Sequence, residues 1–279
     1  MKRILVSGAG GFVGARVMAQ LSGRFEMHAF PKGMLSGATE ADILSAIWEV
    51  KPDAIVHAAA ISDIGESEKH PEASCRANVE LPLWMAKGAK KMGAKLLCFS
   101  SDQVYAGMEG VGPFAEDAPV HPTNTYGRHK LEAEKRVLDF LPEAVMLRAT
   151  WMYDFPGFGL PIRGNLLMNL LCAALRREPQ RFSVNDYRGV TYVRHAIELL
   201  IPAMALPGGV YNFGSENSLS MYDTARDFVK ALGLSLAIEE THGDTRSLAM
   251  DCEKARKNGV VFDDTQAGIR RCTGDYRLS

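Results

Sequence analysis

The composition of this 279-residue chain excludes several classes of protein. Hydrophobic residues make up 47% and charged residues 23%, so the chain can bury a substantial core and fits one large domain or two. The 32 Lys and Arg residues nearly balance the 33 Asp and Glu residues, without long single-sign blocks. The charges therefore create no strong electrostatic field that would favour binding to nucleic acid or to an anionic membrane, and we expect a small-molecule ligand.

The cysteines and the apolar segments indicate the cellular compartment of the protein. The 5 cysteines are widely spaced and form no C-x-x-C pair, which argues against a zinc site and a disulfide framework. The apolar run in MKRILVSGAG is too short for a signal peptide, and no segment reaches the roughly 18 apolar residues of a membrane span. We expect a soluble cytoplasmic protein without a bound metal.

Short apolar runs alternate with helix-favouring stretches along the first half of the chain. The predicted strands cover 4–6, 27–30, 54–58, 95–99 and 144–147, and the predicted helices cover about 14–22, 40–50, 76–92 and 125–140. Parallel strands buried on both faces read as continuous apolar runs, and their alternation with helices is typical of βαβ units. The sequence predicts an α/β fold with a doubly wound parallel sheet.

The pattern changes after Arg148, where the loop WMYDFPGFGLPIRG is too long for a simple connection and is a candidate functional loop. We place a boundary there, with a dinucleotide-binding domain at 1–150 and a smaller, mainly substrate-binding domain at 151–279. Some segments of the second domain are expected to return to the first. The later predicted elements are helices at 165–177, 190–205 and 221–232 and a strand at 210–213.

A glycine motif joins the first predicted strand to the first helix. Gly8, Gly11 and Gly14 form G-x-x-G-x-x-G in the segment SGAGGFVGARV. Glycines there permit a tight turn, close approach of the backbone to a pyrophosphate and close packing of helix on strand, and the helix N-terminus favours the anion. Glycine-rich turns also occur without ligands, but the position in the first βαβ unit favours a dinucleotide site that includes Phe12 and Val13.

The end of the second predicted strand bears on the choice of cofactor. Dinucleotide-binding folds normally carry an acidic residue there to hold the ribose 2′-hydroxyl, but the segment MHAFPKG carries Lys32 instead. Lys32, together with Arg16 of the first helix, could balance an adenosine 2′-phosphate. This interpretation favours NADP and leaves NAD open; the alternative is that both cations are simply solvated.

The segment TNTYGRHKLEAEK places Tyr126 and Lys130 four positions apart at the start of a helix-favouring run. Thr123 or Asn124 is the candidate N-cap, and a spacing of four puts the tyrosine and the lysine on one face of the helix. Such a pair could move a proton. An isolated Y-x-x-x-K pair is more often a surface contact in which the lysine stem covers the ring.

The order of motifs resembles a known family. The segments AIVHAAAISD and LLCFSSDQVYAG, followed by YGRHK and preceded by the glycine turn, are similar to extended short-chain dehydrogenases/reductases of the sugar-nucleotide type. Later segments, such as VMLRATWMY and GGVYNFGSENSLSMYDTA, are similar to dTDP-4-dehydrorhamnose reductases, so the resemblance spans essentially the whole chain. It implies a Rossmann fold and NAD(P)H-dependent reduction of a 4-keto sugar nucleotide in carbohydrate biosynthesis, and it allows a homodimer.

The resemblance also implies roles for individual residues. Ser101, Tyr126 and Lys130 would form the catalytic triad, with Ser100 as a rival for the serine. Tyr126 would protonate the developing alkoxide, and its pKa, roughly 10 in an ordinary phenol, would be lowered by the Lys130 ammonium and the nicotinamide charge. Ser101 would orient the substrate carbonyl. Lys130 would also hold the nicotinamide ribose.

Other residues follow from the same resemblance. The small side chains that let a strand pass close to the cofactor would be Ala58, Ala59 and Ala60. Asp102 and Trp151 would contact the substrate, although a tryptophan just past a strand is often only part of the core. Ser36 stands where many relatives have an aspartate for the adenine amino group.

The residue after Asp102 helps to distinguish a reductase from a dehydratase. Dehydratases of the family carry an Asp-Glu pair at this point, and here the second residue is Gln103, whose amide cannot serve as a base. Two alternatives remain: a sugar-nucleotide epimerase, and a non-catalytic NADP-binding regulatory subunit resembling that of methionine adenosyltransferase. The intact triad argues against the second.

Overall fold

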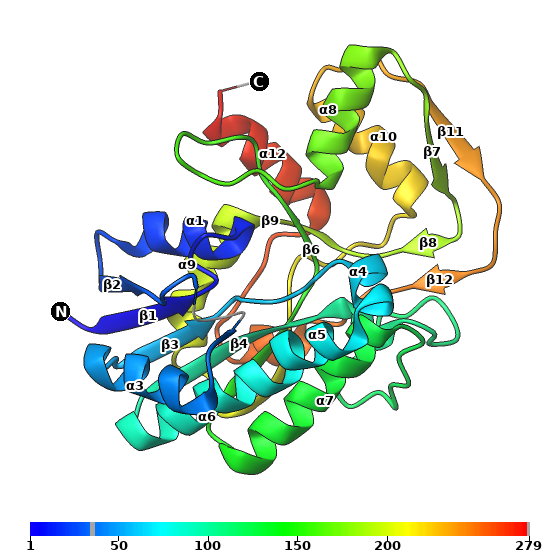
Figure 1. The fold of residues 1–279 in the computed structure, drawn as a ribbon. Coiled ribbons are helices and arrows are strands. Elements are labelled where there is room, and N and C mark those ends of the chain that lie inside the picture. The colour runs from blue at the N-terminus through cyan, green and yellow to red at the C-terminus, as the bar shows by residue number, and fades with distance from the viewer. Residues whose placement is uncertain (34–36, 278–279) are drawn as a thin grey trace.

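The computed structural model describes residues 1–33 and 37–277 and is built around a six-stranded parallel sheet (Figure 1). Its strand order is β10-β5-β4-β3-β1-β2. The strands are β1 (Arg3–Ser7), β2 (Glu26–Ala29), β3 (Ala54–His57), β4 (Lys95–Ser101), β5 (Val145–Ala149) and β10 (Gly209–Phe213). The chain moves outward from β1 in one direction to β2 and in the other through β3, β4 and β5, which confirms the predicted doubly wound α/β fold.

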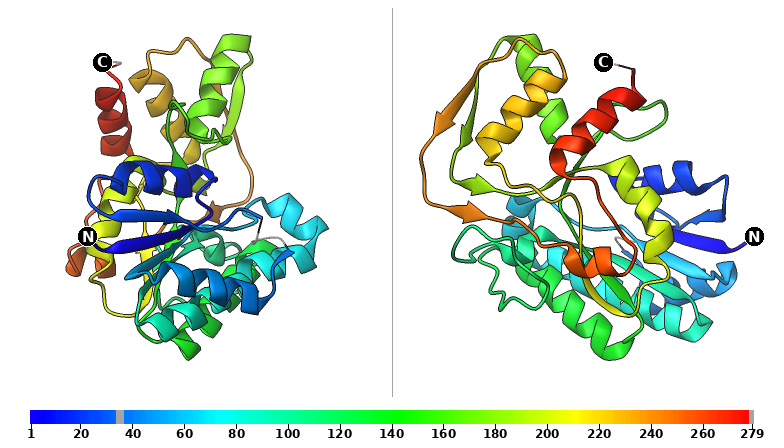
Figure 2. Two further views of the ribbon diagram at one scale, coloured as in Figure 1. Left: turned by 60° about the vertical axis from the view of Figure 1, so that its left-hand side comes forward. Right: turned by 180° about the vertical axis from the view of Figure 1, so that it is seen from behind.

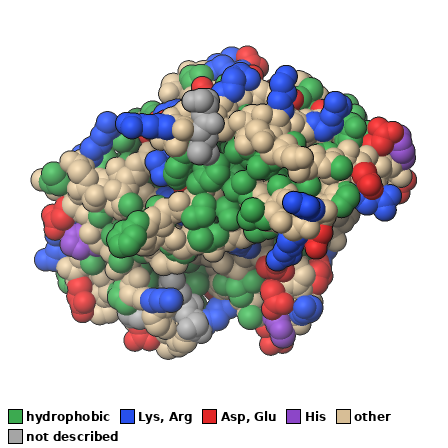
Figure 3. Space-filling view, turned by 90° about the horizontal axis from the view of Figure 1, so that it is seen from above, with side chains coloured by type: hydrophobic (Ala, Val, Ile, Leu, Met, Phe, Trp, Pro, Cys, Tyr) green, Lys and Arg blue, Asp and Glu red, His purple; other side chains and the backbone are tan. Residues whose placement is uncertain are grey.

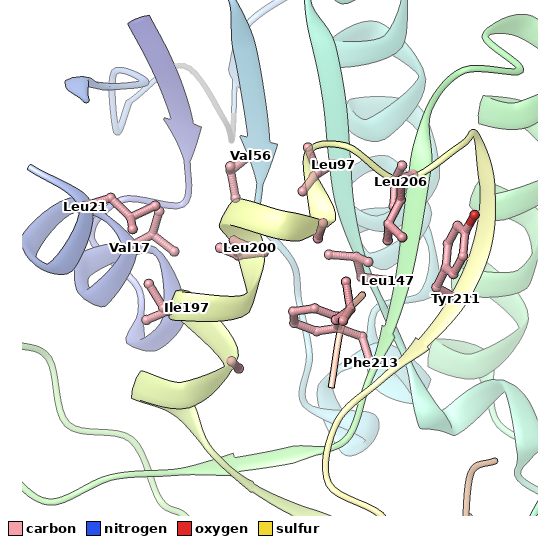
Figure 4. Packing of buried hydrophobic residues seen from close by; sticks show 14 of the residues in the cluster. Val17, Leu21, Val56, Leu97, Leu147, Ile197, Leu200, Leu206, Tyr211 and Phe213 are labelled. Atoms are coloured by element: carbon pink, nitrogen blue, oxygen red, sulfur yellow. The ribbon is translucent and has the colours of Figure 1, made fainter. Parts of the chain in front are cut away.

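Helices cover both faces of this sheet. One face carries α1 (Phe12–Leu21) and α9 (Val193–Ala203), and the other carries α3 (Glu40–Val50), α6 (Leu81–Met92) and α7 (Thr125–Phe140) (Figure 1). Figure 4 shows the first interface, with buried side chains that include Val17, Leu21, Val56, Leu97, Leu147, Ile197, Leu200 and Phe213. Burial on both faces explains why the strands read as continuous apolar runs.

A smaller lobe stands beyond the carboxyl ends of the strands, as the three ribbon views show (Figures 1 and 2). Its helices are α8 (Leu166–Arg176), α10 (Met221–Ala231) and α12 (Thr265–Asp275). Three two-stranded parallel pairs accompany them: β6 (Trp151–Tyr153) with β9 (Val190–Tyr192), β7 (Gln180–Ser183) with β11 (Ile238–Thr241), and β8 (Asp186–Tyr187) with β12 (Arg246–Ser247). This lobe has its own apolar core, centred on Tyr153, Leu170 and Phe228.

The remaining elements are short. They are α4 (Ile64–Lys69), α5 (Pro71–Cys75), a π-helical turn (Arg76–Glu80), a 3-10 turn (Asp102–Tyr105) and α11 (Glu253–Lys257). From above, hydrophobic side chains gather in the middle of the visible face, with Lys and Arg side chains around them (Figure 3). Within the described residues, no helix combines the length and the apolar character that crossing a bilayer requires.

Two predicted helices differ from the structure. The helix predicted at 190–205 starts only at Val193, because the β-branched and aromatic residues Val190, Thr191 and Tyr192 form β9 and pair with β6. The helix predicted at 76–92 begins with a π-helical turn before α6. Ser36 lies outside the described residues.

Candidate active site

A cleft of about 920 Å³ opens at the carboxyl ends of the sheet strands, on both sides of the point where the strand order reverses. It is lined by the segments that follow β1, β2, β3, β4 and β5 and by the start of α7. The predicted site residues that line it are Gly8, Gly11, Phe12, Val13, Lys32, Ala58, Ala59, Ala60, Ser101, Asp102, Tyr126, Lys130 and Trp151. Gly14 and Arg16 do not line it.

The glycine turn brings three backbone segments into close contact. Gly8 has a positive φ of 73°, and a Cβ there would lie 2.7 Å from the Ala59 nitrogen. A Cβ on Gly14 would lie 2.1 Å from the Gly8 carbonyl oxygen, so Gly14 serves packing from behind the turn. The N-cap of α1, Gly11, supplies no side-chain hydrogen bond. The first amides of α1 are therefore left without a side-chain cap beside the cleft, an arrangement that suits an anion.

Arg16 does not take the position predicted for it. Its side chain is 2% exposed, and its Nε donates to Asp154 Oδ2 at 2.7 Å. Its remaining nitrogens donate to backbone carbonyls, among them those of Phe155 and Pro161. The expectation that Arg16 helps Lys32 to balance a phosphate is therefore wrong for this arrangement, because every guanidinium nitrogen already has a partner inside the protein. Only Lys32 of the two lines the cleft.

Tyr126 and Lys130 lie inside the protein and not on its surface. They are 6% and 3% exposed, and the Lys130 Nζ lies 5.7 Å from the centre of the Tyr126 ring. Lys130 Nζ donates to the Phe99 carbonyl at 2.9 Å. The Ser101 hydroxyl, at the end of β4, donates to Asp102 Oδ1 at 3.2 Å and lies close enough to the Tyr126 hydroxyl to lower the pKa of that phenol. The alternative of a solvated surface pair is thereby excluded.

The start of α7 is fixed against the turn after β4. Asn124 is the N-cap, and its Oδ1 accepts from the Gly127 nitrogen at 2.7 Å. The Asn124 amide also donates to Gln103 Oε1 at 3.1 Å. A Cβ on Gly127 would lie 2.3 Å from the Gln103 carbonyl oxygen, so a glycine after Tyr126 is required for this close approach.

Burial moves the pKa values of the tyrosine and the lysine in opposite directions. Burial raises the pKa of Tyr126 to about 12, although the hydrogen bond from Ser101 lowers it. Burial lowers the pKa of Lys130 to about 8. The expected lowering of the phenol pKa by Lys130 is not found in the protein alone, because desolvation of the phenolate outweighs the favourable contacts. At neutral pH the phenol keeps its proton, as a proton donor requires.

A buried network beneath the cleft separates the two serines. Ser100 Oγ donates to Glu134 Oε1 at 2.5 Å beneath the cleft, whereas Ser101 Oγ donates to Asp102 Oδ1 at the cleft wall. Arg148 Nη2 donates to Glu134 Oε2 at 2.8 Å, and both side chains are 3% exposed. Since Glu134 lies on α7 four residues after Lys130 and Arg148 on β5, this ion pair fixes the helix on the sheet.

The far side of the cleft carries charged groups that the sequence analysis missed. Arg188 Nη2 donates to Asp102 Oδ2 at 2.6 Å, and the Arg188 guanidinium lies 5.4 Å from the Trp151 ring centre. Arg188 Nε is buried and has no hydrogen-bond partner. Arg163 also lines the cleft and donates to Ser62 Oγ. Both arginines directly precede a glycine in a loop, but only the tertiary structure shows that these loops face the cleft.

The described residues hold no group of three or more His, Cys, Asp or Glu side chains that could bind a metal ion. A glycine-rich turn at the first strand of a doubly wound sheet, opposite a buried serine, tyrosine and lysine, is the arrangement that the sequence motifs led us to expect. It places the protein among the extended short-chain dehydrogenases/reductases.

Comparison with known proteins narrows this class. The model of the RmlD substrate binding domain family matches residues 1–260, and the chain belongs to this family. A dTDP-4-dehydrorhamnose reductase from Streptomyces griseus is 34% identical over 276 residues, which cover 95% of this chain and 86% of that protein.

Solved structures show the same fold. A dTDP-4-dehydrorhamnose reductase from Bacillus anthracis, in complex with NADP, superposes with a TM-score of 0.88 at 20% identity and covers 98% of both chains. A UDP-glucose 4-epimerase from Thermus thermophilus, in complex with NAD, gives a TM-score of 0.78 at 20% identity over 99% of both chains. Reductases and epimerases thus share this architecture, and the fold alone does not choose between them.

The Glu134–Arg148 pair yields a stability prediction. Arg148→Met should lower the free energy of unfolding by about 3–5 kcal/mol, because it leaves the buried Glu134 carboxylate without its cation. The control is Arg136→Met, which removes an exposed partner of Glu132 on the same helix and should change stability by less than about 1 kcal/mol. Urea denaturation measures both, and equal effects of the two substitutions would contradict the prediction.

Proposed function

We propose that the protein is an NADPH-dependent reductase of a nucleotide-linked 4-keto sugar, of the dTDP-4-dehydrorhamnose type. The observation that carries the proposal is the buried Ser101, Tyr126 and Lys130 group beside the glycine turn in one cleft. The family assignment and the Streptomyces griseus relative support it. A homodimer stays a prediction.

The residues present fit a dinucleotide. The close packing of Gly8 on Ala59 leaves room for a pyrophosphate at the uncapped start of α1, and small alanine side chains form the adjoining wall. Lys32 supplies a cation where an NAD-binding site would normally place an acid, which favours NADP. The Bacillus anthracis structure contains NADP, although the epimerase structure with NAD keeps NAD open as an alternative. When bound, the reduced nicotinamide would supply the hydride.

Three side chains of this chain would then handle the substrate oxygen. Tyr126, protonated at neutral pH because of its raised pKa, would give its proton to the developing alkoxide, which is a stronger base than a phenolate. Ser101 would donate to the same oxygen and orient the carbonyl. Lys130, held by the Phe99 carbonyl, would donate to the nicotinamide ribose.

The substrate would occupy the half of the cleft that faces the smaller lobe, so we propose that residues 151–279 mainly bind substrate. Trp151 presents a ring there, and Arg163 and Arg188 present cations suited to the diphosphate of a sugar nucleotide. Asp102, paired with Arg188, would hold that arginine in place and contact the sugar.

The test of the proposed function is consumption of NADPH with a series of 4-keto sugar nucleotides, followed by absorbance. Stoichiometric conversion of NADPH and ketone into NADP and alcohol is the expected result. An epimerase would interconvert two sugar nucleotides without net consumption, and a regulatory subunit would bind NADP without turnover.

Tyr126→Phe tests the proton donor. We expect kcat to fall by roughly two to four orders of magnitude, the usual contribution of a positioned acid, while the Kd for NADPH stays within about twofold. The control is Tyr222→Phe on α10, outside the cleft, which should keep wild-type turnover. Near-normal turnover in Tyr126→Phe would return this tyrosine to a packing role.

Lys130 gives a pH dependence. Its ammonium is charged at a pH well below its pKa of about 8 and neutral well above it. The affinity for NADPH should therefore have its full value well below pH 8 and fall as the pH rises through 8. The fall should be at most about tenfold per pH unit, because one proton is involved. Lys130→Met should bind NADPH more weakly at pH 7 and show no such fall. Fluorescence titration from pH 6.5 to 9.5 measures both, and a parallel fall in the variant would contradict the assignment.

Lys32→Asp tests cofactor choice. Because Lys32 is exposed, solvent screening limits its contact with a 2′-phosphate to about 1 kcal/mol, or about fivefold in Kd. The variant should bind NADPH more weakly and NADH at least as well, since a carboxylate can accept from a free 2′-hydroxyl. A wild-type protein that binds NADH more tightly than NADPH would overturn this argument but not the dinucleotide site.

A further inference from the structure

The loop that joins β6 to α8 reaches the cleft through its last residues. Arg163, Gly164 and Asn165 line the cleft, whereas Phe158 near the middle of the loop is fully exposed. Arg163 donates to Ser62 Oγ, which belongs to the segment after β3. The Arg163 cation is also close enough to Tyr126 to lower the pKa of that phenol. The loop therefore brings a positive charge into the cleft, within electrostatic range of Tyr126.

A single guanidinium from α1 holds both ends of this loop. Arg16 Nε donates to Asp154 Oδ2 at 2.7 Å, and its Nη2 donates to the Phe155 carbonyl at 3.3 Å. Its Nη1 donates to the Pro161 carbonyl at 3.1 Å, just before the residues that line the cleft. Only a planar group with several fixed donors can bridge the two ends in this way.

Asp154, the residue of the loop that pairs with Arg16, is held in the smaller lobe by further contacts. Its carboxylate is completely buried and accepts from the Tyr276 hydroxyl at 2.9 Å as well as from Arg16. Arg194 Nε lies 3.6 Å from the same carboxylate. Such a carboxylate is costly to displace, because removing any partner leaves a buried charge less well paired.

The second anchor is at the end of the loop. Asn165 caps α8 by accepting from the Met168 nitrogen at 3.0 Å, and its amide donates to the carbonyls of Asp154 and Arg163. The stretch between the anchors is solvent-facing: Ile162 is 60% exposed. Arg163 is thus held at the cleft by the loop anchors Arg16 and Asn165 and by its own hydrogen bond to Ser62.

We propose that Arg16 is a positioning residue for substrate: it holds loop 154–165 so that Arg163 meets the diphosphate of the sugar nucleotide. Arg16 lies on α1, whose first residues line the cleft where the dinucleotide would bind. In this proposal the start of α1 contacts the dinucleotide, and Arg16 in its second turn acts on the substrate through the loop. The inference rests on the proposed function and deepens it, because it assigns the anionic part of the substrate to Arg163 and the control of that contact to Arg16.

Arg16→Lys is the variant of choice, because lysine keeps a cation beside Asp154 but loses the contacts to the loop carbonyls. The probe is dTDP, with binding measured by calorimetry on the full chain. Because Arg163 is exposed, solvent screening limits its contact with a diphosphate, so Arg16→Lys and Arg163→Met should each weaken dTDP binding about fivefold and raise KM for the keto-sugar nucleotide equally. The NADPH Kd and the NADPH-to-NADH preference should stay within about twofold of wild type. Arg24→Lys, an exposed arginine after α1, is the matched control.

The double variant separates positioning from general damage. If Arg16 acts through Arg163, the double variant should bind dTDP no more weakly than Arg163→Met alone. Additive losses, unchanged dTDP binding in Arg16→Lys, or a change in cofactor preference would each overturn the proposal while leaving the proposed function standing. A wild-type protein that binds no nucleoside diphosphate would overturn both.

Discussion

The ion pair between Arg148 and Glu134 is the contact on which the cleft depends. It joins β5 to α7 where both side chains are almost completely buried, so a carboxylate without its cation would be very unfavourable. Glu134, Lys130 and Tyr126 are spaced by four along α7, so fixing the first also fixes the direction of the other two. Ser100 binds the same carboxylate and leaves Ser101 for the cleft. The position of the proposed proton donor thus follows from a buried pair that does not line the cleft.

Burial shifts the pKa values of Tyr126 and Lys130 on α7 in opposite directions. A neutral phenol and a readily neutralised ammonium are both favoured by a dry environment, and the raised and lowered pKa values express the same desolvation. The protein alone therefore does not activate Tyr126 toward phenolate. The proposed ketone reduction would need no such activation, because the group proposed to give up a proton is the neutral phenol.

The sequence predicted the parts of the fold and the site that depend on local pattern. The apolar runs, the glycine turn and the spacing of Tyr126 and Lys130 each carry a signal within a few residues. The role of Arg16 could not be predicted in this way, because its partner Asp154 is 138 positions away and the choice between a phosphate and a buried carboxylate is made by tertiary packing. Arg188 was missed for the same reason, since Asp102 is 86 positions away.

The pairing of β10 with β5 affects the order in which the main sheet can form during synthesis of the chain. β10 pairs with β5 at the end of the sheet, but the whole of residues 150–208 is synthesised between them. Until β10 leaves the ribosome, β5 is an open edge strand with unpaired amides and carbonyls, which is a template for wrong pairing. The growing chain therefore exposes this edge from the time residues 145–149 emerge until residues 209–213 follow, and the smaller lobe is completed only later, because its α10 and α12 come after β10 in the chain.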